Sequence, residues 1–294
     1  CLSLYSMPGV PRSEKGARHI SNFYSSAENL GDMKLDGLIV TGREPRAQIL
    51  EDEPYWGSFK SILDWARDNT YSTVWSCLAA HAAILYLDGI ARIRNDRKYT
   101  GVFDFEKLLD HPLIAGTPSR FKLPHSRWNG IQEDTLTKCG YSVLTRAEDA
   151  GVDTFIKHFK SLFVFFQGHP EYDSNALLLE YRRDVARFLK GEINAYPAIP
   201  QDYFDDDTTL ALHTIQQLAS TRPSLGLLAE VAAVLDPKDI KNTWHSTAVR
   251  IYKNWLQYIW AQKTQQPKIT RVGLVPQRVD ASLPYCVAAG KVPA

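Results

Sequence analysis

The feature of this 294-residue sequence that most limits its fold is a cysteine at the junction of a strand and a helix. Residues 73–76 (TVWS) have the character of a buried strand, and residues 78–87 (LAAHAAILYL) begin at once with strong helix formers. Cys77 therefore lies on a sharp turn of the nucleophile-elbow type. A thiol there is close to the positive end of the helix, which favours the thiolate, and the Leu78 N–H points to where an oxyanion would form.

Strands and amphipathic helices alternate on both sides of this turn. Residues 35–40 (LDGLIV) and 162–166 (LFVFF) are short apolar runs typical of buried parallel strands. Residues 56–67 place apolar side chains at helical spacing. The pattern predicts an α/β fold, with a mostly parallel sheet flanked by helices and with reactive residues at the carboxyl ends of the strands.

A base for the thiol is present at the end of the second strand. His169 and Glu171 follow residues 162–166 with a spacing of two, so a carboxylate can orient an imidazole that activates Cys77. The alternative for this pair is a helix-capping histidine and a solvent-facing glutamate. His81, one helical turn after Cys77, is interpreted as a core or supporting residue rather than the base.

Three further polar segments are candidates for substrate contacts. Arg183, in residues 181–184 (YRRD), could hold a carboxylate through two hydrogen bonds, although a solvated charged face is the simpler interpretation. Ser126 lies in residues 124–128 (PHSRW) and Lys98 precedes Thr100 and Gly101; from the residues alone, both segments are predicted to be ordinary loops.

Composition and cysteine usage exclude several classes of protein. The formal net charge is +1, which gives no long-range attraction to nucleic acid or an anionic membrane, so small molecules are the expected partners. The four cysteines have no paired spacing, and no metal-ligand motif or glycine-rich phosphate loop is present, so no bound metal or cofactor is expected. No apolar run reaches the length of a membrane span, and we expect a soluble, cytoplasmic protein.

The chain is interpreted as one domain, residues 1–294, with part of its N-terminal segment missing before Cys1. Two helical patterns in residues 205–243 are interpreted as a helical insertion or lid, and residues 262–294 as a C-terminal tail.

Several segments, in this order along the chain, resemble the homoserine O-acyltransferase family, which has a class I glutamine-amidotransferase-like (flavodoxin-like) fold. They are HISNFY (19–24), DGLIVTG (36–42), YW (55–56), CLAA (77–80), KYTGV (98–102), PHSRW (124–128), GHPEYD (168–173), EYRRD (180–184) and NWL (254–256). The resemblance implies a homoserine O-succinyltransferase or O-acetyltransferase of methionine biosynthesis, with succinyl-CoA or acetyl-CoA as co-substrate and a homodimeric assembly. It implies a ping-pong reaction through a Cys77 thioester with His169 and Glu171 as the catalytic partners.

The resemblance also places Lys98, Ser126 and Arg183 on substrate-binding positions, Leu78 in the oxyanion hole and Arg46 at the position that helps to select the acyl donor. The chain departs from the family pattern at Arg43 to Arg46 and at Leu78, where a tryptophan is usual. These departures leave open L-serine or a related hydroxy amino acid as acceptor. The same residues are also compatible with a glutaminase-like or amidase-like cysteine hydrolase and with a catalytically inactive binding subunit.

Overall fold

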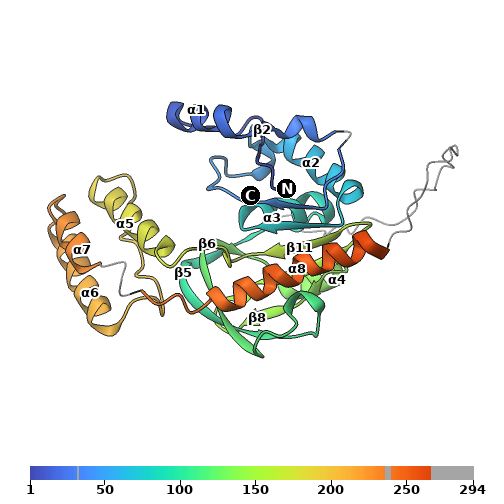
Figure 1. The fold of residues 1–294 in the computed structure, drawn as a ribbon. Coiled ribbons are helices and arrows are strands. Elements are labelled where there is room, and N and C mark those ends of the chain that lie inside the picture. Colours follow the sequence, from blue (N-terminus) through green and yellow to red (C-terminus); the bar gives the residue numbers. More distant parts are fainter. Residues whose placement is uncertain (32, 236–239, 266–294) are drawn as a thin grey trace, which may run out of the picture.

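A computed structural model describes residues 1–31, 33–235 and 240–265 of the chain, and its centre is a five-stranded sheet with the order β3-β4-β11-β10-β7 (Figure 1). The strands are β3 (Gly37–Val40), β4 (Ser72–Ser76), β7 (Ser142–Val143), β10 (Thr154–His158) and β11 (Leu162–Phe166). Strands β3, β4 and β11 are parallel, whereas β10 and β7 are antiparallel to their neighbours. The carboxyl ends of β4 and β11 therefore meet at one edge, where Cys77 and His169 follow.

Helices cover both faces of this sheet, as predicted for an α/β fold. Helices α2 (Trp56–Asn69) and α3 (Leu78–Asp88) lie on one face, and α8 (His245–Gln265) crosses the other (Figure 1). The sequence of β11 is apolar throughout because both of its faces are buried. Phe163 and Phe165 belong to the core under α2 and α3, whereas Val164 and Phe166 pack in the core that includes α8.

A second, antiparallel sheet has the order β6-β5-β8-β9 and was not expected from the sequence. Its strands are β5 (Ile93–Lys107), β6 (Arg120–Gly130), β8 (Thr145–Ala147) and β9 (Gly151–Val152). The prediction of ordinary loops around Lys98 and at residues 124–128 is wrong, because these residues belong to β5 and β6. Proline lacks a backbone N–H, and β6 tolerates Pro124 because it is an edge strand. On the outer side of an edge strand, no N–H is needed for pairing with another strand.

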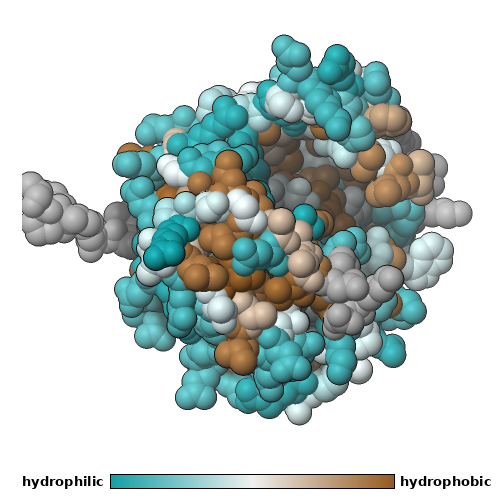
Figure 2. All heavy atoms as spheres, turned by 90° about the vertical axis from the view of Figure 1, so that its left-hand side faces the viewer, coloured by the Kyte–Doolittle hydropathy of each residue, from teal (hydrophilic) through white to brown (hydrophobic). Residues whose placement is uncertain are grey.

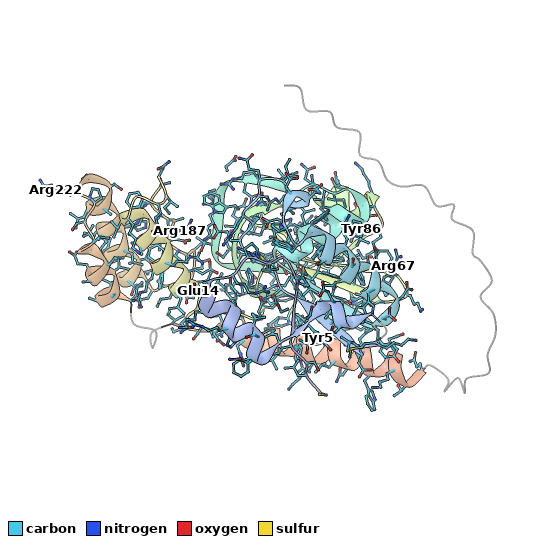
Figure 3. The ribbon with its side chains drawn as sticks, turned by 90° about the horizontal axis from the view of Figure 1, so that it is seen from above. Tyr5, Glu14, Arg67, Tyr86, Arg187 and Arg222 are labelled. Carbon is cyan, nitrogen blue, oxygen red and sulfur yellow. The ribbon has the colours of Figure 1, made fainter. Side chains whose placement is uncertain are left out.

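Three helices form a separate hydrophobic cluster beside the sheets: α5 (Ala176–Leu189), α6 (Asp206–Thr221) and α7 (Leu227–Val234). Seen from above, Arg187 of α5 lies nearer the body of the molecule, and Arg222, which follows α6, lies at the far side (Figure 3). Figure 2 shows the face that carries these helices, with a hydrophobic patch beside a hollow. Helices α6 and α7 fall within residues 205–243, and their interpretation as an insertion or lid stays a prediction.

The remaining elements are shorter or join the elements of the two sheets. They are β1 (Tyr5–Ser6), α1 (Glu14–Phe23), β2 (Ser25–Ser26), α4 (Glu133–Lys138) and three short 3-10 helices, η1 (Ala27–Leu30), η2 (Leu50–Asp52) and η3 (Pro112–Ile114). Of the tail predicted over residues 262–294, the first four residues belong to α8, and residues 266–294 lie outside the described residues. Across the described part of the chain, no helix is both long and apolar enough to cross a membrane.

Candidate active site

Cys77 occupies a strained turn between β4 and α3. Its backbone angles are φ 55° and ψ −121°, a conformation that costs a non-glycine residue about 1–3 kcal/mol. The Cys77 N–H donates to the Phe166 carbonyl over 2.8 Å, which ties the turn to the end of β11. The turn leaves the Cys77 side chain partly exposed while the residues on both sides of it are buried. This is the geometry predicted for a nucleophile elbow.

Gly42 packs closely against the first residue of α3. Leu78 is the first residue of this helix, so its N–H has no acceptor within the helix. A β-carbon built on Gly42 would lie 2.5 Å from the Leu78 nitrogen, so only glycine fits between the end of β3 and the elbow. Leu78 directly follows Cys77, so this N–H is a candidate oxyanion donor.

His169 lies between Cys77 and Glu171. Its Nδ1 is 2.9 Å from Glu171 Oε1, its ring interacts with the Cys77 side chain, and its backbone N–H donates to the Pro124 carbonyl over 2.9 Å. The ring of Tyr172 stacks on the imidazole with centroids 4.1 Å apart. Because Nδ1 is taken by Glu171, Nε2 is the nitrogen left for the thiol.

The charge state of His169 follows from these contacts. Burial alone would lower its pKa, but the hydrogen bonds to Cys77 and Glu171 and their negative charges outweigh burial and raise the pKa to about 10. The imidazole is therefore protonated at neutral pH, and a cationic neighbour of this kind favours the thiolate form of a cysteine. A thiolate is the reactive form of a cysteine nucleophile.

Behind the His169 loop lies a buried polar network that sequence reasoning missed. The Gly168 N–H donates to Asp153 Oδ1 over 2.7 Å, and His125 Nε2 lies 3.3 Å from the same oxygen. A β-carbon on Gly168 would lie 2.6 Å from His125 Nε2, so this glycine is sterically required. His125 was visible only as part of PHSRW, and nothing in the sequence around Asp153 pointed to a partner.

The three predicted substrate-binding residues are brought together by two acidic residues of α5. Lys98 Nζ lies 2.9 Å from Asp184 Oδ2 and 3.8 Å from Glu180 Oε2. The Ser126 hydroxyl donates to Glu180, and Arg183 lies 2.8 Å from Asp184 Oδ1. The acidic residues are the first and last of EYRRD, so the motif contained them although sequence reasoning singled out only its arginine.

These residues line a cavity of about 790 Å³ that Cys77 and His169 also line. Arg43, Glu44 and Pro45 also line it, whereas Arg46 does not. Arg46 is exposed, and its backbone N–H donates to the Glu53 carboxylate. The structure therefore does not bring Arg46 to the cysteine, and its role in donor selection stays a prediction.

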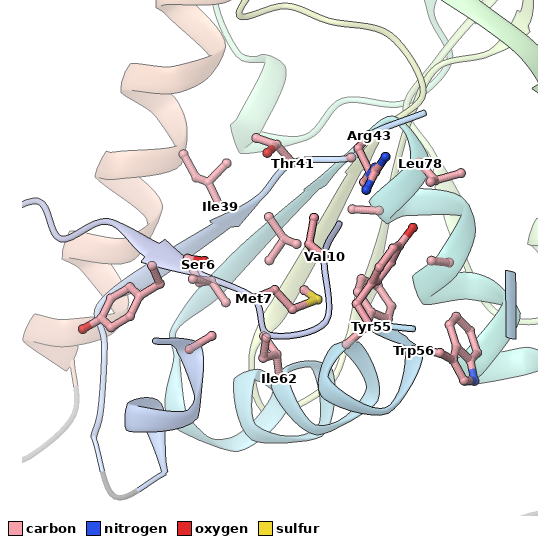
Figure 4. Close-up of a pocket in the computed structure, with 18 of the residues that line it drawn as sticks. Ser6, Met7, Val10, Ile39, Thr41, Arg43, Tyr55, Trp56, Ile62 and Leu78 are labelled. Atoms are coloured by element: carbon pink, nitrogen blue, oxygen red, sulfur yellow. The ribbon is translucent and has the colours of Figure 1, made fainter. Parts of the chain in front are cut away.

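A second cavity of about 310 Å³ adjoins the first (Figure 4). Mostly apolar side chains line it, among them Met7, Val10 and Ile62, and it shares Gly42, Arg43 and Leu78 with the larger cavity. The start of α3 therefore forms part of the wall of both cavities.

An α/β fold with a cysteine on a strand-to-helix elbow and an adjacent histidine–carboxylate pair defines the class of cysteine-dependent enzymes that work through an activated thiol. The family model described as "Homoserine O-succinyltransferase" matches residues 1–266. The chain belongs to the homoserine O-succinyltransferase family and is an acyltransferase, as the sequence motifs predicted.

Individual relatives agree with this assignment. The homoserine O-succinyltransferase of Rhodopseudomonas palustris is 45% identical over 255 residues, which cover 87% of this chain and 77% of that protein. The one from Bradyrhizobium japonicum is 42% identical over 258 residues, covering 88% and 79%. Among solved structures, a glutamine amidotransferase from Methylobacillus flagellatus is 12% identical with a TM-score of 0.47 and covers 92% of this chain and 97% of that one. Because this TM-score is low, the fold class is assigned from the strand order of the chain itself and from its family.

Proposed function

We propose that this protein transfers a succinyl group from succinyl-CoA to the hydroxyl of L-homoserine through a thioester on Cys77, which yields an intermediate of methionine biosynthesis. The observation that carries the proposal is the position of His169, which contacts both Cys77 and Glu171 at the edge of the large cavity. The family name supports the donor and the acceptor.

In the first half-reaction the Cys77 thiolate attacks the thioester carbonyl of the donor. The Leu78 N–H stabilises the tetrahedral oxyanion, a contribution worth roughly 3 kcal/mol in comparable sites. The C–S bond to CoA then breaks, and protonated His169 supplies a proton to the leaving CoA thiolate. The enzyme is left with an acyl thioester on Cys77 and a neutral His169.

In the second half-reaction neutral His169 accepts the proton of the homoserine hydroxyl as its oxygen attacks the Cys77 thioester. Collapse of the intermediate releases O-acylhomoserine and restores the thiolate beside protonated His169. Glu171 holds the imidazole and stabilises its positive charge in both halves.

The polar cluster on α5 fits an amino-acid acceptor. Arg183 offers a guanidinium to the acceptor's carboxylate, and Glu180 and Asp184 provide negative charge for its ammonium group. Lys98 and Ser126 hold the two acidic side chains in place. L-Serine presents the same groups on a chain one carbon shorter, so this cluster alone does not select homoserine.

The test is steady-state kinetics with succinyl-CoA, acetyl-CoA, L-homoserine and L-serine. The proposal predicts parallel double-reciprocal lines with homoserine as the preferred acceptor, and loss of activity in Cys77→Ala. Intersecting lines, or full activity of Cys77→Ala, would rule out the covalent route.

We further propose that the protein is a cytoplasmic homodimer. Light scattering of the purified chain is expected to give twice the monomer mass.

A further inference from the structure

A buried histidine with one ring nitrogen unpaired among the described residues faces the large cavity. His81 lies on α3 one turn beyond Cys77, its side chain lines the cavity, and the residue is only 4% exposed. Its Nδ1 is buried and has no hydrogen-bond partner within the described part of the chain. Because an unsatisfied buried polar group costs about 1–3 kcal/mol, a partner from a bound ligand is expected at this position.

Two arginines flank this histidine and line the same cavity. Arg127 is 6% exposed and is fixed in place, since its Nε donates to His125 over 3.1 Å and its Nη1 to the Asn129 carbonyl over 2.6 Å. Arg92 is partly buried and donates to the Gln48 carbonyl over 3.3 Å, and it forms no ion pair within the described ranges. Burial, followed by the charges of Arg127 and Arg92, lowers the pKa of His81 to about 3.

The charge of the cavity wall around His81 differs from the charge around Glu180 and Asp184 of α5, where we place the amino-acid acceptor. There, Lys98 and Arg183 are neutralised by Glu180 and Asp184. Around His81, two guanidinium groups and a neutral imidazole have no carboxylate within ion-pair distance in the described structure. A cavity wall of this kind binds an anionic group, and a guanidinium matches the planar geometry of a carboxylate.

We propose that His81 and Arg92 bind the distal carboxylate of a dicarboxylic acyl group while its other end is a thioester on Cys77. His81 donates an N–H to this carboxylate, and the Arg92 guanidinium forms an ion pair with it. Arg127, which lines the same cavity, adds further positive charge. These residues then select succinyl over acetyl donors, a role that the sequence had assigned to Arg46. The inference rests on the proposed function, because it requires the acyl group to be on Cys77.

The test compares kcat/KM for succinyl-CoA and acetyl-CoA in Arg92→Gln, His81→Ala and Arg46→Gln. Arg92→Gln is expected to lower the value for succinyl-CoA at least 30-fold and the value for acetyl-CoA less than about 3-fold. His81→Ala should also lower the ratio of kcat/KM for succinyl-CoA to kcat/KM for acetyl-CoA. Arg92→Lys should recover part of the activity with succinyl-CoA that Arg92→Gln loses. Arg94→Gln is the matched control, since Arg94 lies two residues beyond Arg92, stacks on Trp128 at 4.3 Å and does not line the cavity.

The outcomes separate this inference from the proposed function. An equal fall for both donors, with an unchanged melting temperature, or a shift of the ratio only in Arg46→Gln, would overturn the assignment of His81 and Arg92 while leaving the Cys77 route intact. A wild-type protein that prefers acetyl-CoA would overturn it as well. If wild-type protein accepts an acyl group from neither donor, the proposed function itself fails, and this failure is visible before any variant is made.

Discussion

Gly42 and Leu78 are in direct backbone contact, because a β-carbon on Gly42 would lie 2.5 Å from the Leu78 nitrogen and 3.0 Å from its α-carbon. This contact joins the end of β3 to the turn that carries Cys77. It places the loop after β3 against the N–H that we assign to the oxyanion hole.

Gly42→Ala should therefore displace the elbow and lower kcat about 100-fold, the scale of losing one oxyanion donor. The measurement is single-turnover acylation by succinyl-CoA, with Gly57→Ala as the control. A β-carbon on Gly57 meets nothing within 4 Å, and this helical substitution should leave the rate unchanged. Normal acylation by Gly42→Ala would show that the Leu78 N–H has no such role.

The interactions of His169 with Cys77 and Glu171 predict an unusual titration of its imidazole. The imidazole should keep its proton from its ordinary pKa of about 6.5 up to a pKa of about 10, and lose it only as the pH rises further. In Cys77→Ala one of the two contacts that raise the pKa is lost, so the pKa should fall toward its ordinary value. Histidine ¹⁵N NMR over pH 5 to 11 measures both pKa values, and an identical titration in the two proteins would show that Cys77 does not raise the pKa of His169.

Arg183 should act on the acceptor and not on the donor. Arg183→Ala removes the guanidinium proposed for the amino-acid carboxylate, so KM for homoserine should rise about 10- to 100-fold. The rate of acyl transfer from succinyl-CoA to Cys77 should stay within about 2-fold. Arg182→Ala is the neighbouring control, since Arg182 is exposed and does not line the cavity. Equal slowing of acylation would place Arg183 in the donor site instead.

Two buried histidines should make the fold sensitive to acid. Burial, followed by the positive charges of Arg127 and Arg92, lowers the pKa of His81 to about 3; burial also lowers the pKa of His125, to about 4, despite its contact with Asp153. Both are neutral when folded, whereas in the unfolded chain they gain protons below about pH 6.5. Their contribution to the free energy of unfolding is therefore complete above pH 6.5 and is lost as the pH falls toward 4. Each histidine lowers this free energy by up to ~1.4 kcal/mol per pH unit.

Urea unfolding at pH 7, 6 and 5 measures this loss. His81→Gln should unfold with a shallower pH dependence than the wild type, because one of the two histidines no longer contributes. Curves that run parallel for the two proteins would show that His81 is not held neutral by the fold.

The sequence was sufficient to locate the elbow and its base because both follow short apolar strands whose local pattern is unambiguous. Cys77 and His169 could be placed at one sheet edge from the rule that parallel strands align their carboxyl ends. The pairing of β5 with β6 could not be predicted in this way. Lys98 lies where the register shifts between Arg94 and Tyr99, and such an irregular, polar segment has the composition of a loop.

The acidic partners of Lys98, Ser126 and Arg183 and the arginines around His81 were also beyond the sequence. Glu180, Ser126 and Lys98 come from α5, β6 and β5, and only the tertiary fold brings them together. His81 has the apolar surroundings of a core residue, which is how the sequence was interpreted, and it is indeed buried. What the pattern could not reveal is that its Nδ1 lacks a partner within the described residues and that it faces the cavity.

The most direct test of the covalent route is the intact mass of the protein after brief exposure to succinyl-CoA without an acceptor. One added succinyl group is expected, absent in Cys77→Ala and removed when L-homoserine is added. A folded wild-type protein that gains no mass, or a Cys77→Ala protein that gains the same mass, would contradict a thioester on Cys77.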